Sequence, residues 1–182
     1  MNIIKHIDYQ INKEKYRNIF YDNIQLGQWH YTVRTRKELY WYQIMIPNDH
    51  VLKPLIEPVE KDLNIFGMNN LPRFAYQFPN TKVDHHTDDH YAKWDKTKNF
   101  EKDKVKVHTC LTSININLLD TTPTIHIEHQ PYEYQCALIN TGSFMHGVEP
   151  DSNPRLILKF CLTHHWNEVK ERLKNYIKNE NI

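Results

Sequence analysis

Three short segments of this sequence place a histidine two residues before an acidic residue. They are His6-Ile7-Asp8, His86-Thr87-Asp88 and His126-Ile127-Glu128. In an extended strand, residues two apart project to the same side, so each pair could offer an imidazole and a carboxylate to one metal ion. Two histidines and one carboxylate on one face of the metal are typical of non-haem iron(II) sites, which keep the opposite face open.

The pattern alone is not specific, because a chain with 12 histidines and 22 acidic residues contains about one or two such pairs by chance. His6 lies near the N-terminus, ahead of a predicted helix and without strands around it. His126 precedes His146 by only 20 residues, which leaves room for little more than one further strand. Because isoleucines alternate with His126 and Glu128, we interpret that segment as the polar face of a strand.

The pair at His86 and Asp88 has a more suitable context. It ends a short extended segment, 82–86, and opens into a long polar stretch, 89–105. His146 follows 58 residues after Asp88, which is space for about four strands. His146 also comes directly after a predicted strand and turn. We therefore predict that His86, Asp88 and His146 bind one metal ion.

The elements that must position these ligands are mainly strands. Apolar, aromatic and β-branched residues predict strands at 28–34, 38–46, 74–78, 82–86, 107–118, 124–128, 134–140 and 155–163. Helices are predicted at 12–23 and 166–178, and Asp49 could cap a shorter one toward residue 63, limited by Pro54 and Pro58. Helices at both ends with many strands between them predict a β-sandwich or barrel with flanking helices. No linker divides the chain, so we expect a single domain over 1–182.

The composition restricts the possible partners and the cellular location. Lysine and arginine together number 23 and acidic residues 22, so the chain lacks the basic excess that is usual in nucleic-acid-binding proteins. No segment approaches the roughly 18 apolar residues that cross a bilayer, and the N-terminus lacks the pattern of a secretory signal. Cys110, Cys136 and Cys161 lie in apolar segments and are predicted to be reduced core residues. We expect a cytoplasmic protein without nucleic-acid or membrane partners.

The order His-x-Asp, then His, then Arg resembles that of the 2-oxoglutarate/Fe(II)-dependent dioxygenase superfamily. The similar pieces are DHHTDD, TSININLL, LINTGSFMHGVEPDSNPRLILKF and THHW. They are most similar to the aspartyl/asparaginyl β-hydroxylase-like and prolyl-hydroxylase-like members. The resemblance implies a mainly β fold with flanking helices, a double-stranded β-helix (jelly roll) whose core spans about 72–166.

The resemblance also implies a cofactor set and a reaction. His86, Asp88 and His146 would hold Fe(II), and 2-oxoglutarate would bind as co-substrate. Its far carboxylate needs a fixed cation, and Arg155 is placed to meet it with two parallel hydrogen bonds. The implied enzyme is a hydroxylase that consumes O2 and converts 2-oxoglutarate to succinate and carbon dioxide. A free amino acid, a peptidyl residue and another small metabolite all fit as its substrate.

Several further residues are candidates for the surroundings of this site. Tyr76 and Asn115 lie on strands expected to flank the pocket and could hydrogen-bond the co-substrate. Tyr91 and Trp94, in the long polar stretch, could form a lid over the substrate. His85 would face away from His86, while Asp89 and His90 are typical of loop positions.

A second hypothesis comes from a different class of protein. A cupin-like jelly roll could bind a metal or small ligand without turnover, but it would normally carry a His-x-His pair with a nearby glutamate, which this sequence lacks. A zinc hydrolase has less support, because no HExxH motif is present. Succinate release that depends on Fe(II) and 2-oxoglutarate would distinguish these possibilities.

Overall fold

The structure, a computed structural model, describes residues 3–31, 39–88 and 110–178. Its strands are β1 (Ile4–His6), β2 (Gln28–Tyr31), β3 (Leu39–Met45), β4 (Asn70–Gln77), β5 (Val83–His86), β6 (Thr112–Asn117), β7 (Thr124–Ile127), β8 (Gln130–Glu133), β9 (Cys136–Ile139), β10 (His146–Val148) and β11 (Arg155–Leu162). Its helices are α1 (Lys13–Asp22), the 3-10 turn η1 (Ile24–Leu26), α2 (Lys53–Asp62) and α4 (Trp166–Arg172).

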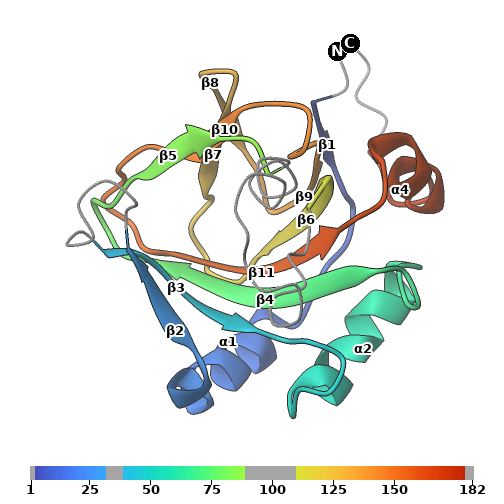
Figure 1. The fold of residues 1–182 in the computed structure, drawn as a ribbon, viewed down its shortest axis with the longest axis horizontal. Helices are drawn as coiled ribbons and strands as arrows, with labels where there is room; N and C mark the ends of the chain where they lie inside the picture. Colours follow the sequence, from blue (N-terminus) through green and yellow to red (C-terminus); the bar gives the residue numbers. More distant parts are fainter. Residues whose placement is uncertain (1–2, 32–38, 89–109, 179–182) are drawn as a thin grey trace, which may run out of the picture.

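The strands form two antiparallel sheets that face each other (Figure 1). The larger has the order β1-β9-β6-β11-β4-β3-β2 and the smaller the order β5-β10-β7-β8. From β4 onward the chain alternates between them, except that β7 and β8 form a hairpin in one sheet: β4, β6, β9 and β11 belong to the larger sheet, and β5, β7, β8 and β10 to the smaller. This alternation is the topology of a double-stranded β-helix. The predicted jelly roll with flanking helices is therefore confirmed.

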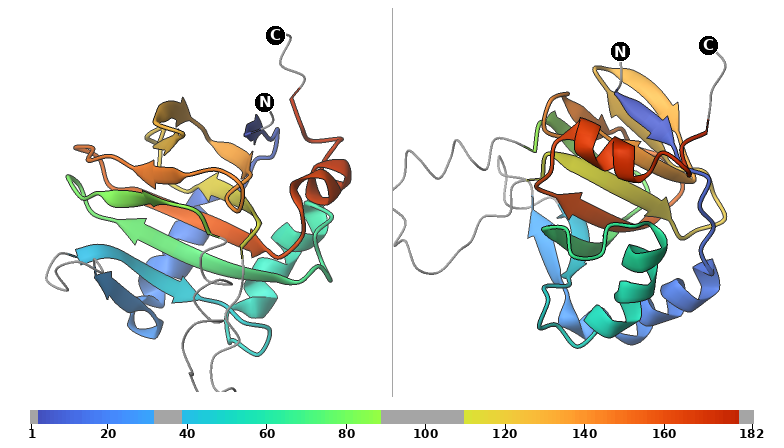
Figure 2. Two further views of the ribbon diagram at one scale, coloured as in Figure 1. Left: turned by 45° about the horizontal axis from the view of Figure 1, so that its top comes forward. Right: turned by 90° about the vertical axis from the view of Figure 1, so that its right-hand side faces the viewer.

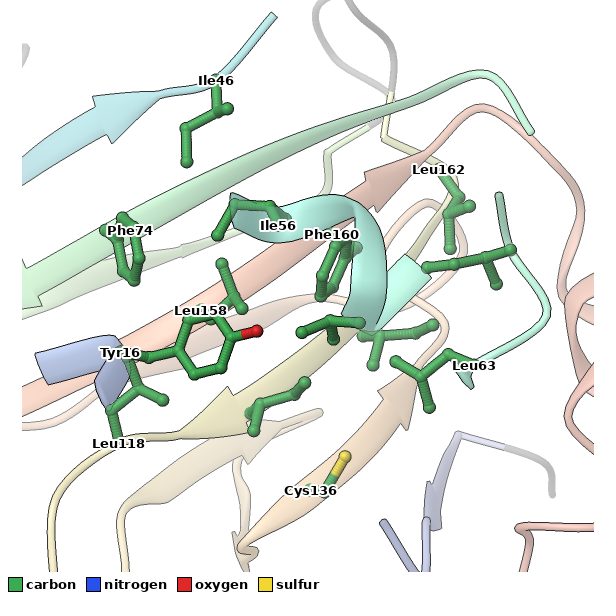
Figure 3. Close-up of a cluster of buried hydrophobic side chains, with 14 of the residues drawn as sticks. Tyr16, Ile46, Ile56, Leu63, Phe74, Leu118, Cys136, Leu158, Phe160 and Leu162 are labelled. Atoms are coloured by element: carbon green, nitrogen blue, oxygen red, sulfur yellow. The ribbon is translucent and has the colours of Figure 1, made fainter. Parts of the chain in front are cut away.

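The main hydrophobic core lies on the side of the larger sheet that faces away from the smaller one. Figure 2 shows α1 and α2 covering this side. Because alternate strand residues point to opposite faces, Leu158 and Phe160 of β11 project toward the helices. There they pack with Phe20 and Ile56, in the cluster of which Figure 3 draws a part. Full burial of each such side chain stabilises the fold by about 1.5–3 kcal/mol.

The structure corrects the predicted start of α2. Asp49 does not cap this helix, which begins at Lys53 after the N-cap residue Leu52, whose side chain accepts no hydrogen bond. Pro54 lies in the first turn, where the fixed φ angle of proline suits a helix and a backbone N–H is not needed. α1 follows its prediction closely, because the Asn12 side chain caps it by accepting from the backbone N–H of Lys15 at 3.0 Å.

Three short strands were not predicted: β1, β8 and β10. Each has only three or four residues, which is too few for an alternating pattern to be recognised. The polar stretch 89–105, with Asp89, His90, Tyr91 and Trp94, lies outside the described residues. In the described ranges, no helix is long and apolar enough to span a bilayer.

Candidate metal centre

His86 and His146 come together because their strands are neighbours in the smaller sheet. β10 pairs antiparallel with β5, and His146 lies directly opposite His86. Their ring centroids are 4.5 Å apart. Gly147 permits this close pairing, because a Cβ atom at that position would lie 2.8 Å from the carbonyl oxygen of Val83 in β5. A side chain there would force β10 away from β5 and separate the two imidazoles.

Asp88 completes a group of three at the end of β5. Its backbone N–H donates to the carbonyl oxygen of Thr141 at 3.0 Å, which fixes the chain where it leaves the strand. Oδ1 lies 3.3 Å from Nε2 of His86, and Oδ2 lies 3.7 Å from Nε2 of His146. One potential ligand atom from each residue lies within 4.8 Å of the others. The structure thus brings the three predicted metal ligands together.

Hydrogen bonds from the backbone orient both histidine rings. Nδ1 of His86 lies 2.7 Å from the carbonyl oxygen of Asp84, and Nδ1 of His146 lies 3.2 Å from that of Phe144. A carbonyl can only accept, so each Nδ1 carries the proton and each Nε2 keeps its lone pair. Two such nitrogens beside a carboxylate suit Fe(II), and imidazole ligands in metalloproteins are usually held in this way.

A buried lysine accompanies the carboxylate. Nζ of Lys159, on β11 of the larger sheet, lies 3.4 Å from Oδ2 of Asp88, and both side chains are 8% exposed. Burial by itself would raise the pKa of Asp88, but the charge of Lys159 holds it well below its usual value. The carboxylate is therefore charged at neutral pH and available to a cation.

His146 stays neutral, as a metal ligand must. Its burial, together with the positive charge of Lys159, lowers its pKa to about 4, although Asp88 opposes the shift. Because the ring is unprotonated at neutral pH, a metal ion does not have to displace a proton from Nε2.

A cavity between the sheets extends from the histidines along β11. Its walls include His86, His146, Asn115, Arg155 and Lys159, with apolar side chains between them. Arg155 donates to the hydroxyl of Tyr134, while its Nε is buried without a hydrogen-bond partner in the described part of the chain. Oδ1 of Asn115 is likewise buried and unpaired there. The unpaired donor of Arg155 fits a carboxylate, which only accepts, while the unpaired oxygen of Asn115 fits a ligand group that donates.

The geometry gives the predicted role of Tyr76 no support. Tyr76 borders the cavity, but its ring stacks on Phe20 of α1 at a centroid distance of 5.9 Å. It therefore lies on the helix-covered face of the larger sheet, with Phe74 and Leu158. Its place in β4 explains the difference, because residue 76 alternates with Ala75 and Gln77, which face the smaller sheet.

The other His-x-acid pairs do not join the group. His126 lies on β7 opposite Gly147. Its ring stacks on that of His85, with 6.3 Å between the ring centroids. Its partner Glu128 accepts a hydrogen bond from the backbone N–H of Met145. His6 lies on β1, an edge strand of the larger sheet, whereas the three candidate ligands lie on or next to strands of the smaller sheet. His85 projects away from His86, as predicted, and its Nε2 lies 3.5 Å from Glu149.

Lys159 is the main feature that the sequence reasoning missed. β11 alternates apolar residues at 156, 158, 160 and 162 with Arg155, Ile157, Lys159 and Cys161. Since Arg155 was already expected at the pocket, this alternation places Lys159 on the same side. The signal was present, but the contact with Asp88 spans 71 residues of sequence and is visible only in the folded chain.

Comparison with solved structures shows that this fold is similar to those of two oxygenases. A prolyl-4-hydroxylase from Pseudomonas putida aligns with 82% of this chain and 82% of its own, at 13% identity and a TM-score of 0.51. An oxidoreductase of the 2OG-Fe(II) oxygenase family from Burkholderia pseudomallei aligns with 88% of this chain and 83% of its own, at 9% identity and a TM-score of 0.57. No family model matches the sequence, and no curated protein matches it significantly.

Proposed function

We propose that the protein is a 2-oxoglutarate- and O2-dependent non-haem Fe(II) oxygenase that hydroxylates an amino acid, a peptidyl residue or another small metabolite. The observation that carries the proposal is the meeting of His86, Asp88 and His146 at a cavity that also contains Arg155. The ligand set is the one used by iron oxygenases with open coordination positions. The shared fold supports the same reaction class.

The residues around the cavity would have separate tasks. The two Nε2 atoms and the Asp88 carboxylate would hold Fe(II), and Arg155 would donate from its unpaired Nε to the far carboxylate of 2-oxoglutarate. Asn115 would donate to the same ligand through the N–H groups of its side-chain amide. Ile125 and Ile157 would keep water from the reacting groups. When bound, Fe(II) and 2-oxoglutarate would supply the activation of O2 that the side chains cannot provide, with succinate and carbon dioxide as co-products.

Lys159 would hold the Asp88 carboxylate in position through their ion pair. Its ammonium group attracts Oδ2 of Asp88, which favours coordination of the metal through the other carboxylate oxygen. A carboxylate that uses one oxygen leaves more of the metal's coordination sphere for co-substrate and O2. The lysine thus has a positioning role in the proposed enzyme.

The test is succinate formation by the full-length protein with a panel of free amino acids and short peptides. We expect succinate only when Fe(II), 2-oxoglutarate and O2 are all present, and the true substrate should gain the mass of one oxygen atom. Omission of each component in turn is the first control, and His126→Gln is the matched histidine variant. Tight Fe(II) binding without succinate under any condition would contradict the proposal and support a cupin-like binding protein instead.

A further inference from the structure

Two buried cysteines lie behind the metal centre and have no part in the function proposed above. Cys161 follows Lys159 by two residues on β11, on the same face of the strand. Cys110 lies just before β6, where the backbone N–H of Leu111 donates to the carbonyl oxygen of Leu162 at 2.9 Å. This pairing brings the two thiols into a hydrogen bond. The exposed fractions are 3% for Cys110 and 1% for Cys161.

The surroundings of Cys161 favour its thiolate. The Arg73 guanidinium donates a hydrogen bond to its sulfur, and Lys159 adds a second positive charge nearby. Burial opposes ionisation, but the hydrogen bond from Cys110 and these two cations lower the pKa of Cys161 to about 5. Burial and the same hydrogen bond raise the pKa of Cys110. At neutral pH the pair therefore consists of one thiolate and one thiol.

Cys136 provides an internal comparison. It is equally buried, but it lies on β9 in the hydrophobic core among aliphatic side chains. Burial alone raises its pKa to about 12. A buried thiol of this kind is chemically inert.

We propose that Cys110 and Cys161 form a redox-active dithiol that hydrogen peroxide converts to a disulfide. The Cys161 thiolate attacks one peroxide oxygen and breaks the O–O bond, which gives a sulfenic acid and hydroxide. The Cys110 sulfur then displaces the sulfenic oxygen, which leaves as water with the Cys110 proton. Peroxide is reduced by two electrons and the two thiols are oxidised. The hydrogen bond between the two side chains makes the sulfurs neighbours before oxidation.

The pair is linked to the metal centre through one residue. The hydroxyl of Thr141 donates to the carbonyl oxygen of Cys110 at 3.3 Å, and the carbonyl oxygen of Thr141 accepts from the backbone N–H of Asp88. Oxidation would also remove the anionic acceptor of Arg73. The inference does not depend on the proposed function, because it concerns only the chemistry of these thiols.

The experiment uses the full-length protein, kept metal-free by a chelator so that iron cannot decompose the peroxide. After treatment with equimolar hydrogen peroxide, digestion without reductant and mass spectrometry should show a Cys110–Cys161 link and the loss of two hydrogen atoms. Dithiothreitol should reverse both. The rate should change less than about threefold between pH 6.5 and 8.5, whereas the thiolate fraction of an ordinary thiol rises by several tens of fold over this range.

Single variants separate the two steps. Cys136→Ala should form the disulfide as the wild type does. Cys110→Ala should stop at a sulfenic acid on Cys161, which dimedone traps. Wild-type protein that keeps both thiols reduced, that goes directly to a sulfinic acid, or that links Cys136 would overturn the proposal. The wild-type result stands alone even if a variant fails to fold.

Discussion

The two faces of β11 are both buried, but one carries apolar side chains and the other carries polar and ionisable ones. Leu156, Leu158 and Phe160 face the helices and are 0% exposed. Lys159 and Cys161 face the smaller sheet and are 6% and 1% exposed. The first face contributes to stability, because each apolar side chain leaves water without losing a hydrogen bond. The second retains charges whose burial costs free energy unless they are paired.

The cavity face of the larger sheet contains buried polar atoms that lower the stability of the fold but can bind a ligand. Buried polar atoms without partners in the described residues include Nε of Arg73, Oγ of Ser113, Oδ1 of Asn115 and Nε of Arg155. All four belong to the larger sheet, on its cavity side. Changes on the cavity face should therefore affect activity more than stability, and changes on the helix face should do the opposite. The predictions below test this separation, beginning with the largest expected effect.

His86→Ala should abolish the proposed activity while leaving the fold nearly intact. The side chain is 34% exposed, so its loss leaves little cavity. We expect Fe(II) affinity and succinate formation to fall at least about 100-fold, because loss of even an outer-shell partner of a ligand costs 10–100-fold. Calorimetric Fe(II) titration under anaerobic conditions and denaturation curves measure the two effects. His126→Ala is the control, and equal losses in both variants would contradict the assignment.

Phe160→Ala is the matched change on the opposite face of β11. Removal of this fully buried ring should lower the free energy of unfolding by about 3–5 kcal/mol, because the surrounding helices cannot close the cavity. Urea denaturation checks the value, and Phe160→Leu should cost much less. At temperatures where the variant is folded, its Fe(II) affinity should be unchanged. A large loss of affinity would show that the two faces are not independent.

Arg155→Lys should weaken co-substrate binding and leave Fe(II) binding intact. A lysine keeps the charge but cannot form two parallel hydrogen bonds with a carboxylate. We expect the KM for 2-oxoglutarate to rise about 10–100-fold, since hydrogen bonds to charged groups contribute about 1.5–3 kcal/mol. Initial rates at varied 2-oxoglutarate measure this change. An unchanged KM would assign the far carboxylate to another cation, with Lys159 the next to test.

The metal-free protein should lose stability as the pH falls from about 6.5 toward 4. Burial holds the pKa of folded His146 at about 4, below the ordinary value of 6.5. Between these values the unfolded chain binds a proton that the folded chain does not, so acid favours unfolding. The loss should reach at most about 3 kcal/mol for this group. The low pKa of Asp88 extends the loss to lower pH.

Urea denaturation with a chelator, at steps from pH 7.5 to 4.5, measures this dependence. His146→Gln should flatten the curve because glutamine does not titrate. A wild-type curve that is already flat would mean that His146 is protonated in the folded state.

Asn115→Leu should have the smallest effect on stability. The variant replaces a buried amide oxygen that lacks a partner with an apolar group of similar size, so the free energy of unfolding should change by less than about 1 kcal/mol. If Oδ1 accepts a hydrogen bond from the substrate, the KM for the substrate should rise several-fold, and if the amide N–H groups donate to 2-oxoglutarate, the KM for 2-oxoglutarate should rise. Unchanged kinetic constants would remove Asn115 from the site.

Local patterns in the sequence predicted most strands and helices and the three candidate metal ligands. Alternation within strands and the Asn12 cap predicted most elements. The spacing between Asp88 and His146 left room for about four strands, and the described chain has β6 to β9 there, of which β8 was not predicted. The role of Tyr76 stays a prediction: it borders the cavity, but its ring stacks on Phe20, and a strand pattern does not say which face of the strand lines a pocket. β10 was missed because three residues show no period.

The sequence alone therefore determined which residues lie on a common side of each strand and in what order the ligands occur. Only the tertiary structure decided which sides meet: the pairing of His86 with His146, the approach of Lys159 to Asp88, and the contact of Cys161 with Arg73. The physical reason is that side-chain alternation is a property of a single strand. Contacts between strands depend on sheet order and register, which the chain reaches only when both sheets close around one core.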